Sequence, residues 1–160
     1  MNVKFPALIA VLGVAGAFAV AAQNMPDRSQ DAAWMNAQSA ALAGRQAKDG
    51  WGWLEGGVLW RRVAGDGTGP RPTINDTVKV HYAGTLVDGT EFDSSYGGQP
   101  VSFPLRGLIP AWQLAIPQAA VGDTIEIAVP ADLGYGSKGA GPIPGGATLL
   151  FKIELLGIES

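Results

Sequence analysis

Hydrophobic and polar positions alternate over several short runs in the second half of the chain, as expected of half-buried β-strands. Between residues 76 and 82, Val78, Val80 and Tyr82 fall on one face of the predicted strand, with polar residues on the other. Strand-like runs also lie at residues 58–63, 85–87, 90–92, 123–129 and 147–156. The pattern therefore predicts a sheet built from short strands.

Turns and one long loop separate these runs. Asp88-Gly89 stands between 85–87 and 90–92 and predicts a tight hairpin, because this pair readily adopts the conformations of two-residue turns. Residues 134–146 hold too much glycine and proline for a regular element. Long loops in compact domains usually carry function, so we expect part of a site here.

One short helix is predicted in this half of the chain, at residues 110–116. Ile109, Trp112 and Ile116 recur at helical spacing, and Pro110 suits the first helical position. The order of elements is several strands, a short helix, a strand, the long loop and a last strand. It predicts an α+β roll, in which an antiparallel curled β-sheet of about five strands wraps over one short α-helix.

The first 22 residues differ in kind from the rest. Lys4 is their only charge, and residues 8–22 are all apolar or glycine, ending in small residues. This composition predicts a secretory signal peptide cleaved near Ala22, and hence a periplasmic or secreted protein. The alternative is an uncleaved inner-membrane anchor, since residues 5–22 approach the roughly 20 needed to span a bilayer. Membrane contact is expected only in that case.

Residues 23–53 form a polar, alanine-rich segment. Its run 31–42 has good helix formers, with Asp31 placed to cap a helix and Gly44 placed to end it. We favour a flexible arm carrying this short helix over a docking or dimer-forming segment. The chain is expected to be a monomer, or a dimer through residues 23–50.

Composition excludes several classes of function. The net charge is −3 and no basic cluster exceeds Arg61-Arg62, so no nucleic-acid surface is expected. The chain has no cysteine and only one histidine, His81, which leaves too few soft ligands for a zinc or iron–sulfur site. We expect no cofactor and no metal. Because His81 lies on the polar face of its strand, we interpret it as an exposed residue and not as a catalytic base.

The candidate chemistry is aromatic. Each aromatic side chain could belong to the core or to the wall of a binding pocket, and the pattern alone leaves both readings open. A buried tyrosine hydroxyl needs a hydrogen-bond partner, and Asp93 could provide one. The aromatic residues concerned are Tyr82, Phe92, Phe103, Trp112, Tyr135 and Phe151.

Between residues 54 and 158 the sequence resembles the FKBP family of macrolide-binding peptidyl-prolyl cis/trans isomerases. It is most similar to the exported bacterial branch, whose members resemble the macrophage infectivity potentiator. Five motifs carry the resemblance, in order: VHYAGTLVDGTEFDSS at 80–95, LIPAW at 108–112, VGD at 121–123, YG at 135–136 and ATLLFKIELL at 147–156. It implies that residues 54–160 form the isomerase domain.

The resemblance also implies a site. Trp112 would form the floor under a proline ring, and Tyr135 and the backbone N–H of Ile109 would donate to substrate carbonyls. Asp93 would lie near the reacting amide and accept from Tyr82, and these five residues would be the catalytic ones. The implied pocket contains Tyr82, Phe92, Asp93, Val101, Phe103, Leu108, Ile109, Trp112, Tyr135, Ile143 and Phe151.

Some positions depart from the family pattern. Val101 stands where several members have an aromatic residue, Ala111 replaces a usual glycine, and Leu114 replaces a common acidic residue. The loop after Tyr135 is shorter than in some relatives. These departures concern substrate preference and macrolide affinity more than activity.

The expected function is acceleration of X-Pro bond rotation in exported polypeptides, without a covalent intermediate. An apolar pocket would favour the twisted amide, which has lost the charge separation of the planar one. Partners would be proline-containing clients in the cell envelope and a macrolide inhibitor. Two rivals remain: a binding module that holds unfolded chains without turnover, and a structural or adhesion domain.

Overall fold

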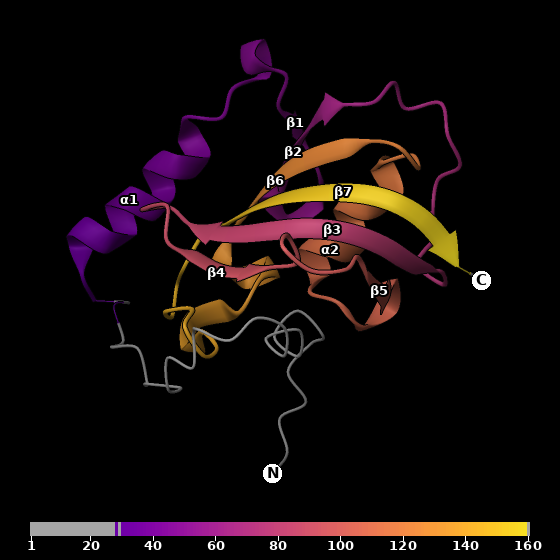
Figure 1. Ribbon diagram of the computed structural model, residues 1–160. Coiled ribbons are helices and arrows are strands. Elements are labelled where there is room, and N and C mark those ends of the chain that lie inside the picture. The colour runs from indigo at the N-terminus through magenta and orange to yellow at the C-terminus, as the bar shows by residue number, and fades with distance from the viewer. Residues whose placement is uncertain (1–27, 29, 160) are drawn as a thin grey trace.

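The computed structural model describes residue 28 and residues 30–159, and its centre is one antiparallel sheet (Figure 1). The strands follow the order β1-β2-β6-β7-β3-β4, and β5 pairs with β3. They are β1 (Gly52–Trp53), β2 (Leu59–Ala64), β3 (Thr77–Leu86), β4 (Glu91–Ser94), β5 (Val101–Pro104), β6 (Thr124–Val129) and β7 (Leu149–Glu159). The expected α+β roll is confirmed, with seven strands where about five were predicted.

The long central strands β3 and β7 follow the alternation read from the sequence. Val78, Val80 and Tyr82 are all buried on the inner face of β3. On β7 the inner face consists of Leu149, Phe151, Ile153 and Leu155. β1 and β5 escaped prediction because strands of two and four residues are too short to show a period.

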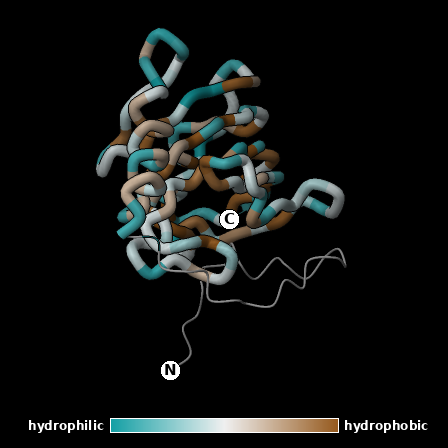
Figure 2. Tube along the Cα trace, turned by 90° about the vertical axis from the view of Figure 1, so that its left-hand side faces the viewer, coloured by the Kyte–Doolittle hydropathy of each residue, from teal (hydrophilic) through white to brown (hydrophobic). Residues whose placement is uncertain are grey.

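Helix α2 (Pro110–Ala115) covers the inner face of the sheet, behind the strands in Figure 1. It begins with Pro110 at its first position, as predicted, and its side chains at Ala111, Trp112 and Ala115 are buried. Hydrophobic stretches of the chain gather in the interior of the domain, while several of the outer loops are hydrophilic (Figure 2). The main core is therefore the layer between α2 and the sheet, and a smaller buried cluster of Trp51, Leu59 and Ala128 packs with Leu42 of α1 and Leu150.

Short 3-10 turns link the regular elements. The predicted hairpin at Asp88-Gly89 is present: Gly89 has a φ of 89°, and the Asp88 carboxylate accepts from the Thr90 N–H at 2.9 Å. The turns are η1 (Ala47–Asp49), η2 (Glu55–Gly57), η3 (Leu105–Gly107), η4 (Ile116–Gln118), η5 (Ala131–Leu133) and η6 (Gly136–Lys138). η5 ends just before the predicted long loop of residues 134–146, and η6 lies at its start.

Helix α1 (Ala32–Ala43) packs against the sheet domain of its own chain. Asp31 caps it by accepting from the Trp34 N–H at 3.0 Å, and Gly44 ends it, as the sequence indicated. Trp34 and Gln38 are buried, and the Gln38 side chain accepts from the Thr148 N–H at 2.7 Å. This is the docking alternative, on the chain's own domain, and not the favoured free arm.

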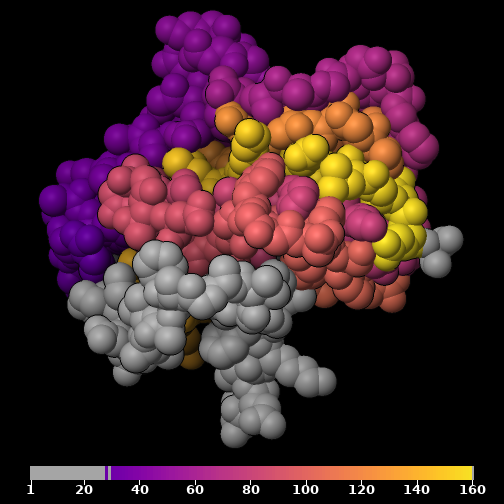
Figure 3. All heavy atoms as spheres, viewed as in Figure 1, coloured from indigo at the N-terminus to yellow at the C-terminus, as the bar shows by residue number. Residues whose placement is uncertain are grey.

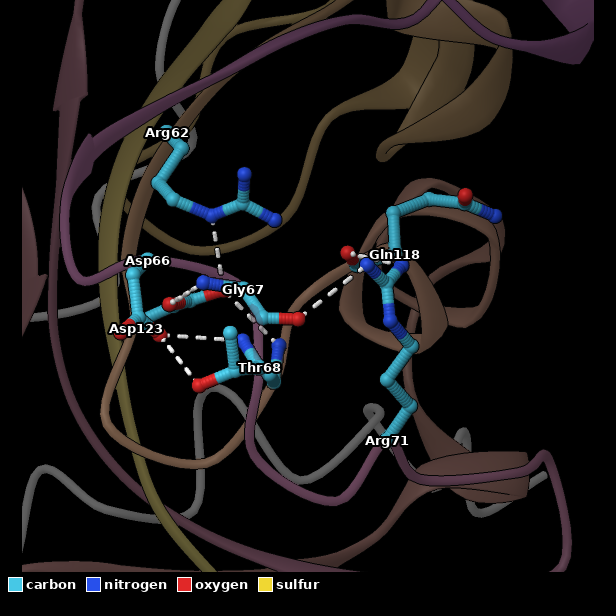
Figure 4. Close-up of polar contacts among 8 residues, drawn as sticks. Arg62, Asp66, Gly67, Thr68, Arg71, Gln118 and Asp123 are labelled. Atoms are coloured by element: carbon cyan, nitrogen blue, oxygen red, sulfur yellow. Dashed lines mark hydrogen bonds and ion pairs between the residues drawn. The ribbon is translucent and has the colours of Figure 1, made fainter.

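A buried carboxylate fastens the turn after β2 to the turn before β6 (Figure 4). Asp123 accepts from the Arg62 Nε at 2.8 Å, the Ala120 N–H at 2.9 Å and the Gly67 N–H at 3.0 Å. A side chain at Gly65, where φ is +87°, would collide with Asp123. Burial alone would raise the pKa of Asp123, but these hydrogen bonds and the Arg62 charge outweigh it and hold the pKa below its usual value. We call this group the Asp123 clamp.

The predicted signal segment, residues 1–22, lies outside the described residues. In the part of the chain that the structure describes, neither helix is long and apolar enough to cross a membrane.

Candidate functional site

Aromatic rings from five different elements meet on the inner face of the sheet. Trp112 of α2 is at their centre, edge-on to Tyr82 of β3 at 5.3 Å and to Phe151 of β7 at 5.4 Å between ring centroids. Phe103 of β5 lies 6.2 Å from Trp112, and Phe92 of β4 stands perpendicular to Phe151 at 5.5 Å. Edge-to-face contacts of this kind hold rings in fixed orientations. We call these rings the aromatic cluster.

Trp112 is fully buried at the centre of the cluster, with 0% of its surface exposed. The helix start at Pro110 directs it inward, and the inward positions of β3 and β7 surround it. Its indole N–H is buried and has no acceptor among the described residues. An apolar floor with one uncommitted donor suits a ligand that is mostly hydrocarbon and carries a few carbonyl groups.

Tyr82 and Asp93 form the polar edge of the cluster. The Tyr82 hydroxyl donates to the Asp93 carboxylate at 2.7 Å, across neighbouring strands β3 and β4. Burial raises the pKa of Asp93, with the hydrogen bond from Tyr82 opposing the rise. Burial, followed by the hydrogen bond to Asp93, raises the pKa of Tyr82. The tyrosine therefore stays protonated at physiological pH and holds the carboxylate in place.

Tyr135 brings a second hydroxyl from the glycine-rich loop. Its side chain packs against the core, and the hydroxyl is buried without a hydrogen-bond partner among the described residues. Burial raises its pKa first, and the nearby charge of Asp93 raises it further. The hydroxyl thus remains a protonated donor with its hydrogen bond still to be made. A buried polar group of this kind is costly and points to an external partner.

The remaining predicted residues line the same region. Leu108, Ile109 and Ile143 are buried in the same hydrophobic core, and Val101 packs against it half-buried. The Ile109 N–H donates to no acceptor within residues 30–159. All eleven predicted residues therefore belong to one region, although they come from separate parts of the chain.

Gly84 is a residue of the site that the sequence reasoning missed. A Cβ there would lie 2.5 Å from the Phe92 ring and 2.8 Å from the Phe151 ring. Only glycine lets these two rings cross the strand at this point. The available signal was a glycine inside an alternating strand, which often marks a close approach of another group.

His81 lies outside the aromatic cluster, but it is not the exposed residue that the sequence predicted. It is half-buried, stacks on Tyr96 at 5.1 Å and shares a 2.9 Å hydrogen bond with the Ser95 hydroxyl. Within residues 28 and 30–159, no three His, Cys, Asp or Glu side chains are grouped so as to hold a metal ion.

Comparison with protein families identifies the domain. The profile described as FKBP-type peptidyl-prolyl cis-trans isomerase matches residues 69–156. This span runs from the turn before β3 to β7 and contains the whole aromatic cluster.

Bacterial relatives match about three quarters of the chain. The FKBP-type peptidyl-prolyl cis-trans isomerase FkpA of Aeromonas hydrophila is 45% identical over 119 residues, which are 74% of this chain and 44% of that protein. The outer membrane protein MIP of Legionella longbeachae is 41% identical over 122 residues, which are 75% of this chain and 52% of that protein. The chain thus spans about half the length of these relatives.

Solved structures agree with the sequence matches. A peptidyl-prolyl cis-trans isomerase of Pseudomonas syringae pv. tomato has a TM-score of 0.73 and 34% identity, covering 86% of this chain and 99% of that one. FkpA of Escherichia coli has a TM-score of 0.76 and 35% identity, covering 81% of this chain and 61% of that one. The fold, the aromatic cluster and the family match lead to one conclusion: the chain belongs to the family of FKBP-type peptidyl-prolyl cis-trans isomerases.

Proposed function

We propose that this chain accelerates cis/trans rotation of X-Pro bonds in polypeptides, without forming a covalent intermediate. One observation carries the proposal: the unpartnered Tyr135 hydroxyl is buried beside Asp93, at the edge of an aromatic cluster centred on Trp112. A water-excluding apolar surface with few, fixed polar groups is what this reaction needs, because no bond is broken.

The energetics explain why so few polar groups suffice. Rotation about a peptide bond faces a barrier of about 18–20 kcal/mol that arises from amide resonance. The twisted amide has lost the charge separation of the planar amide, so an apolar surface stabilises the twisted form more. Each ~1.4 kcal/mol of this preference gives about tenfold in rate. Uncatalysed X-Pro exchange takes tens to hundreds of seconds, so a few such factors bring it to the timescale of folding.

Individual roles follow from position. The proline ring would lie on Trp112, and the Tyr135 hydroxyl and the Ile109 N–H would donate to carbonyls on either side of the reacting bond. Asp93, held by Tyr82, would lie beside the reacting amide. Donors already fixed in the protein need no reorganisation when the amide twists.

Ligand preference would be set at the half-buried edge formed by Val101. A valine there fills less space than an aromatic side chain, so we propose a roomier wall that accepts apolar residues before proline. One relative, 48% identical over 93 residues, is named FK506-binding protein 2. A macrolide of that kind is therefore the inhibitor we propose for this pocket.

We propose that the protein acts in the cell envelope on exported, proline-containing chains. The composition of residues 1–22 supports this location, as does the similarity to the outer membrane protein MIP of Legionella longbeachae. The mass of the protein recovered from a periplasmic extract would show whether cleavage occurs near Ala22 or the segment stays as an anchor.

We further propose that the chain is a monomer. Helix α1 uses its buried side chains, Trp34 and Gln38, within its own domain, which leaves little for a partner. Light scattering tests this, since a dimer through residues 23–50 would double the mass.

Exchange spectroscopy on an X-Pro peptide, in the absence of protease, tests the activity directly. The full chain should speed cis/trans exchange, and a macrolide should abolish the effect. A parallel assay of the suppression of client aggregation distinguishes the isomerase from a binding module. Suppression without X-Pro exchange would favour a module that holds unfolded chains without turnover. Failure to bind any proline ligand would favour a structural domain.

A further inference from the structure

A hollow of about 660 Å³ lies on the outer face of the sheet, opposite the aromatic cluster. Outward residues of β2, β6, β7 and β3 form its floor, and the end of α1 with Trp51 forms its wall. Figure 3 views this face, with the indigo atoms of α1 standing beside the yellow atoms of β7. On β7, Leu150 and Lys152 face the hollow while Phe151 between them points to the aromatic cluster. Phe151 is also among the residues that line the hollow, so the two regions share strands and this one residue.

The hollow concentrates positive charge in an acidic protein. Arg45, Arg61 and Lys152 line it, together with the carboxylates Asp49 and Glu126, in a chain whose net charge is −3. These five residues are all the charged groups that line the hollow, so its balance is positive.

Arg61 is fully engaged by the protein. Its guanidinium contacts the Glu126 carboxylate at 2.7 and 2.8 Å and donates to the Asp49 carbonyl at 3.2 Å. It also lies over the Trp51 ring, 4.7 Å from its centroid. Arg61 thus anchors the wall and offers little to a ligand.

Arg45 and Lys152 are the uncommitted charges. Among the described residues neither makes an ion pair, and Arg45 bonds only to the Ala41 carbonyl while its Nε is buried without an acceptor. Its guanidinium lies 5.1 Å from the centroid of the same Trp51 ring. Burial lowers the pKa of Arg45, with the charge of Glu126 opposing and that of Arg61 adding to the effect. A partly desolvated cation that makes no ion pair of its own is a place where an arriving anion gains most.

We propose that this hollow binds a carboxylate-bearing ligand, with the carboxylate between Arg45 and Lys152 and an apolar part against Leu150. The volume falls in the range of ligand pockets, roughly 300–1,000 Å³. Leu150 and the alanines at the end of α1 supply an apolar surface beside the charges. Two sources fit this chemistry, an acidic segment of a polypeptide and a free organic acid.

The indole N–H signals of the full, ¹⁵N-labelled chain provide the test. Trp51 reports on the hollow and Trp112 on the aromatic cluster, and a Trp51→Phe variant assigns the first signal. The probes are an acetylated, amidated Leu-Glu-Leu-Glu peptide, its glutamine counterpart, and succinate. The glutamate peptide should shift Trp51 and leave Trp112 in place, and the glutamine peptide should bind about tenfold more weakly or worse.

Variants locate the contact. Arg45→Met, which keeps the stacking length, and Lys152→Gln, at an exposed position, should each weaken binding about tenfold. Lys79→Gln, an exposed lysine elsewhere on the sheet, should change nothing, and X-Pro exchange should be the same in all three. If succinate binds as well as the peptide, the ligand is a free acid. The proposal is overturned if neither acidic probe shifts Trp51, or if the shift survives in the Lys152→Gln variant.

Discussion

Two aspartates of this domain are almost equally inaccessible, yet their surroundings are opposite. Asp123 is 2% exposed and accepts from a guanidinium and two backbone N–H groups. Asp93 is 5% exposed, and its side-chain partner is the hydroxyl of Tyr82. Accordingly the pKa of Asp123 is lowered and that of Asp93 is raised.

The difference separates structural from functional burial. A carboxylate with all its oxygens satisfied stabilises the fold, because its charge is better solvated inside than in water. A carboxylate that is buried but under-satisfied costs stability, and proteins retain such groups where a ligand completes the set. Asp93 lies near Tyr135, whose buried hydroxyl also lacks a hydrogen-bond partner among the described residues.

The largest effect is expected on stability, from Asp123→Ala. It removes the acceptor for Arg62, Gly67 and Ala120 and should lower the free energy of unfolding by about 3 kcal/mol. Urea denaturation measures it, and exchange activity per folded molecule should stay within about twofold of wild type. Asp66→Ala in the neighbouring exposed turn is the control. An equal loss of stability in Asp66→Ala would show that the hydrogen bonds of the Asp123 clamp contribute no more than those of an exposed turn.

Asp93→Ala should show the reverse pattern. We expect kcat/KM for an X-Pro peptide to fall about tenfold or more, because a group aimed at the reacting amide is lost. Stability should fall by less than in Asp123→Ala, because the removal of an under-satisfied charge from the interior offsets the loss of the acceptor for the buried Tyr82 hydroxyl. Protease-free exchange and urea denaturation on the same sample decide it. A variant that is less stable but fully active would place Asp93 with the structural residues.

Helix α1 should contribute less to the free energy of unfolding than the Asp123 clamp does, and its contribution can be measured at Gln38. Gln38→Leu removes the acceptor for the buried Thr148 N–H at the C-terminal end of the glycine-rich loop and should cost about 1–2 kcal/mol. Asn36→Leu, at an exposed position of the same helix, is the control. A helix that behaved as a free arm would show no loss in urea denaturation.

Tyr135→Phe tests the second unsatisfied group. The hydroxyl makes no bond in the described chain, so its removal should not destabilise the fold. A neutral hydrogen bond is worth about 0.5–1.5 kcal/mol, so kcat/KM should fall several-fold. Unchanged kinetics over a range of peptides would exclude Tyr135 as a donor to substrate.

The smallest effect is a difference in pH dependence. The stabilising contribution of Asp123, whose folded pKa is lowered, is present above its unfolded pKa and is lost as pH falls through the folded value. Asp93 has a raised folded pKa, so its cost to stability appears as pH rises through that value. Denaturation from acid to neutral pH should therefore show the gap between wild type and Asp123→Asn narrowing toward acid. The gain in the free energy of unfolding from Asp93→Asn should grow toward neutral pH. The difference between wild type and variant should therefore change with pH in opposite directions for the two aspartates, and a change in the same direction would contradict this.

Local periodicity predicted most of the regular structure. The inner faces of β3 and β7, the hairpin at Asp88-Gly89 and the start of α2 at Pro110 all depend on neighbouring residues, which the sequence displays directly. The order and spacing of the motifs then selected eleven residues for a pocket, and the structure brings these residues into one region.

Contacts between distant segments could not be read in the same way. The Arg62–Asp123 pair joins residues 61 positions apart, and the Gln38–Thr148 bond joins residues 110 apart. The types of these residues do not indicate which distant residue each will contact. The charged hollow was hidden for the same reason, because it exists only once α1 has docked beside the sheet.

The central claim is that the aromatic cluster itself does the catalysis, and exchange spectroscopy on a Trp112→Ala, Phe151→Ala double variant tests it most directly. Its fold is verified first by the amide spectrum, and the fully folded Asp123→Asn protein serves as the comparison. We expect an X-Pro exchange rate close to the uncatalysed one for the double variant and near wild type for Asp123→Asn. A folded double variant with wild-type exchange would contradict the account.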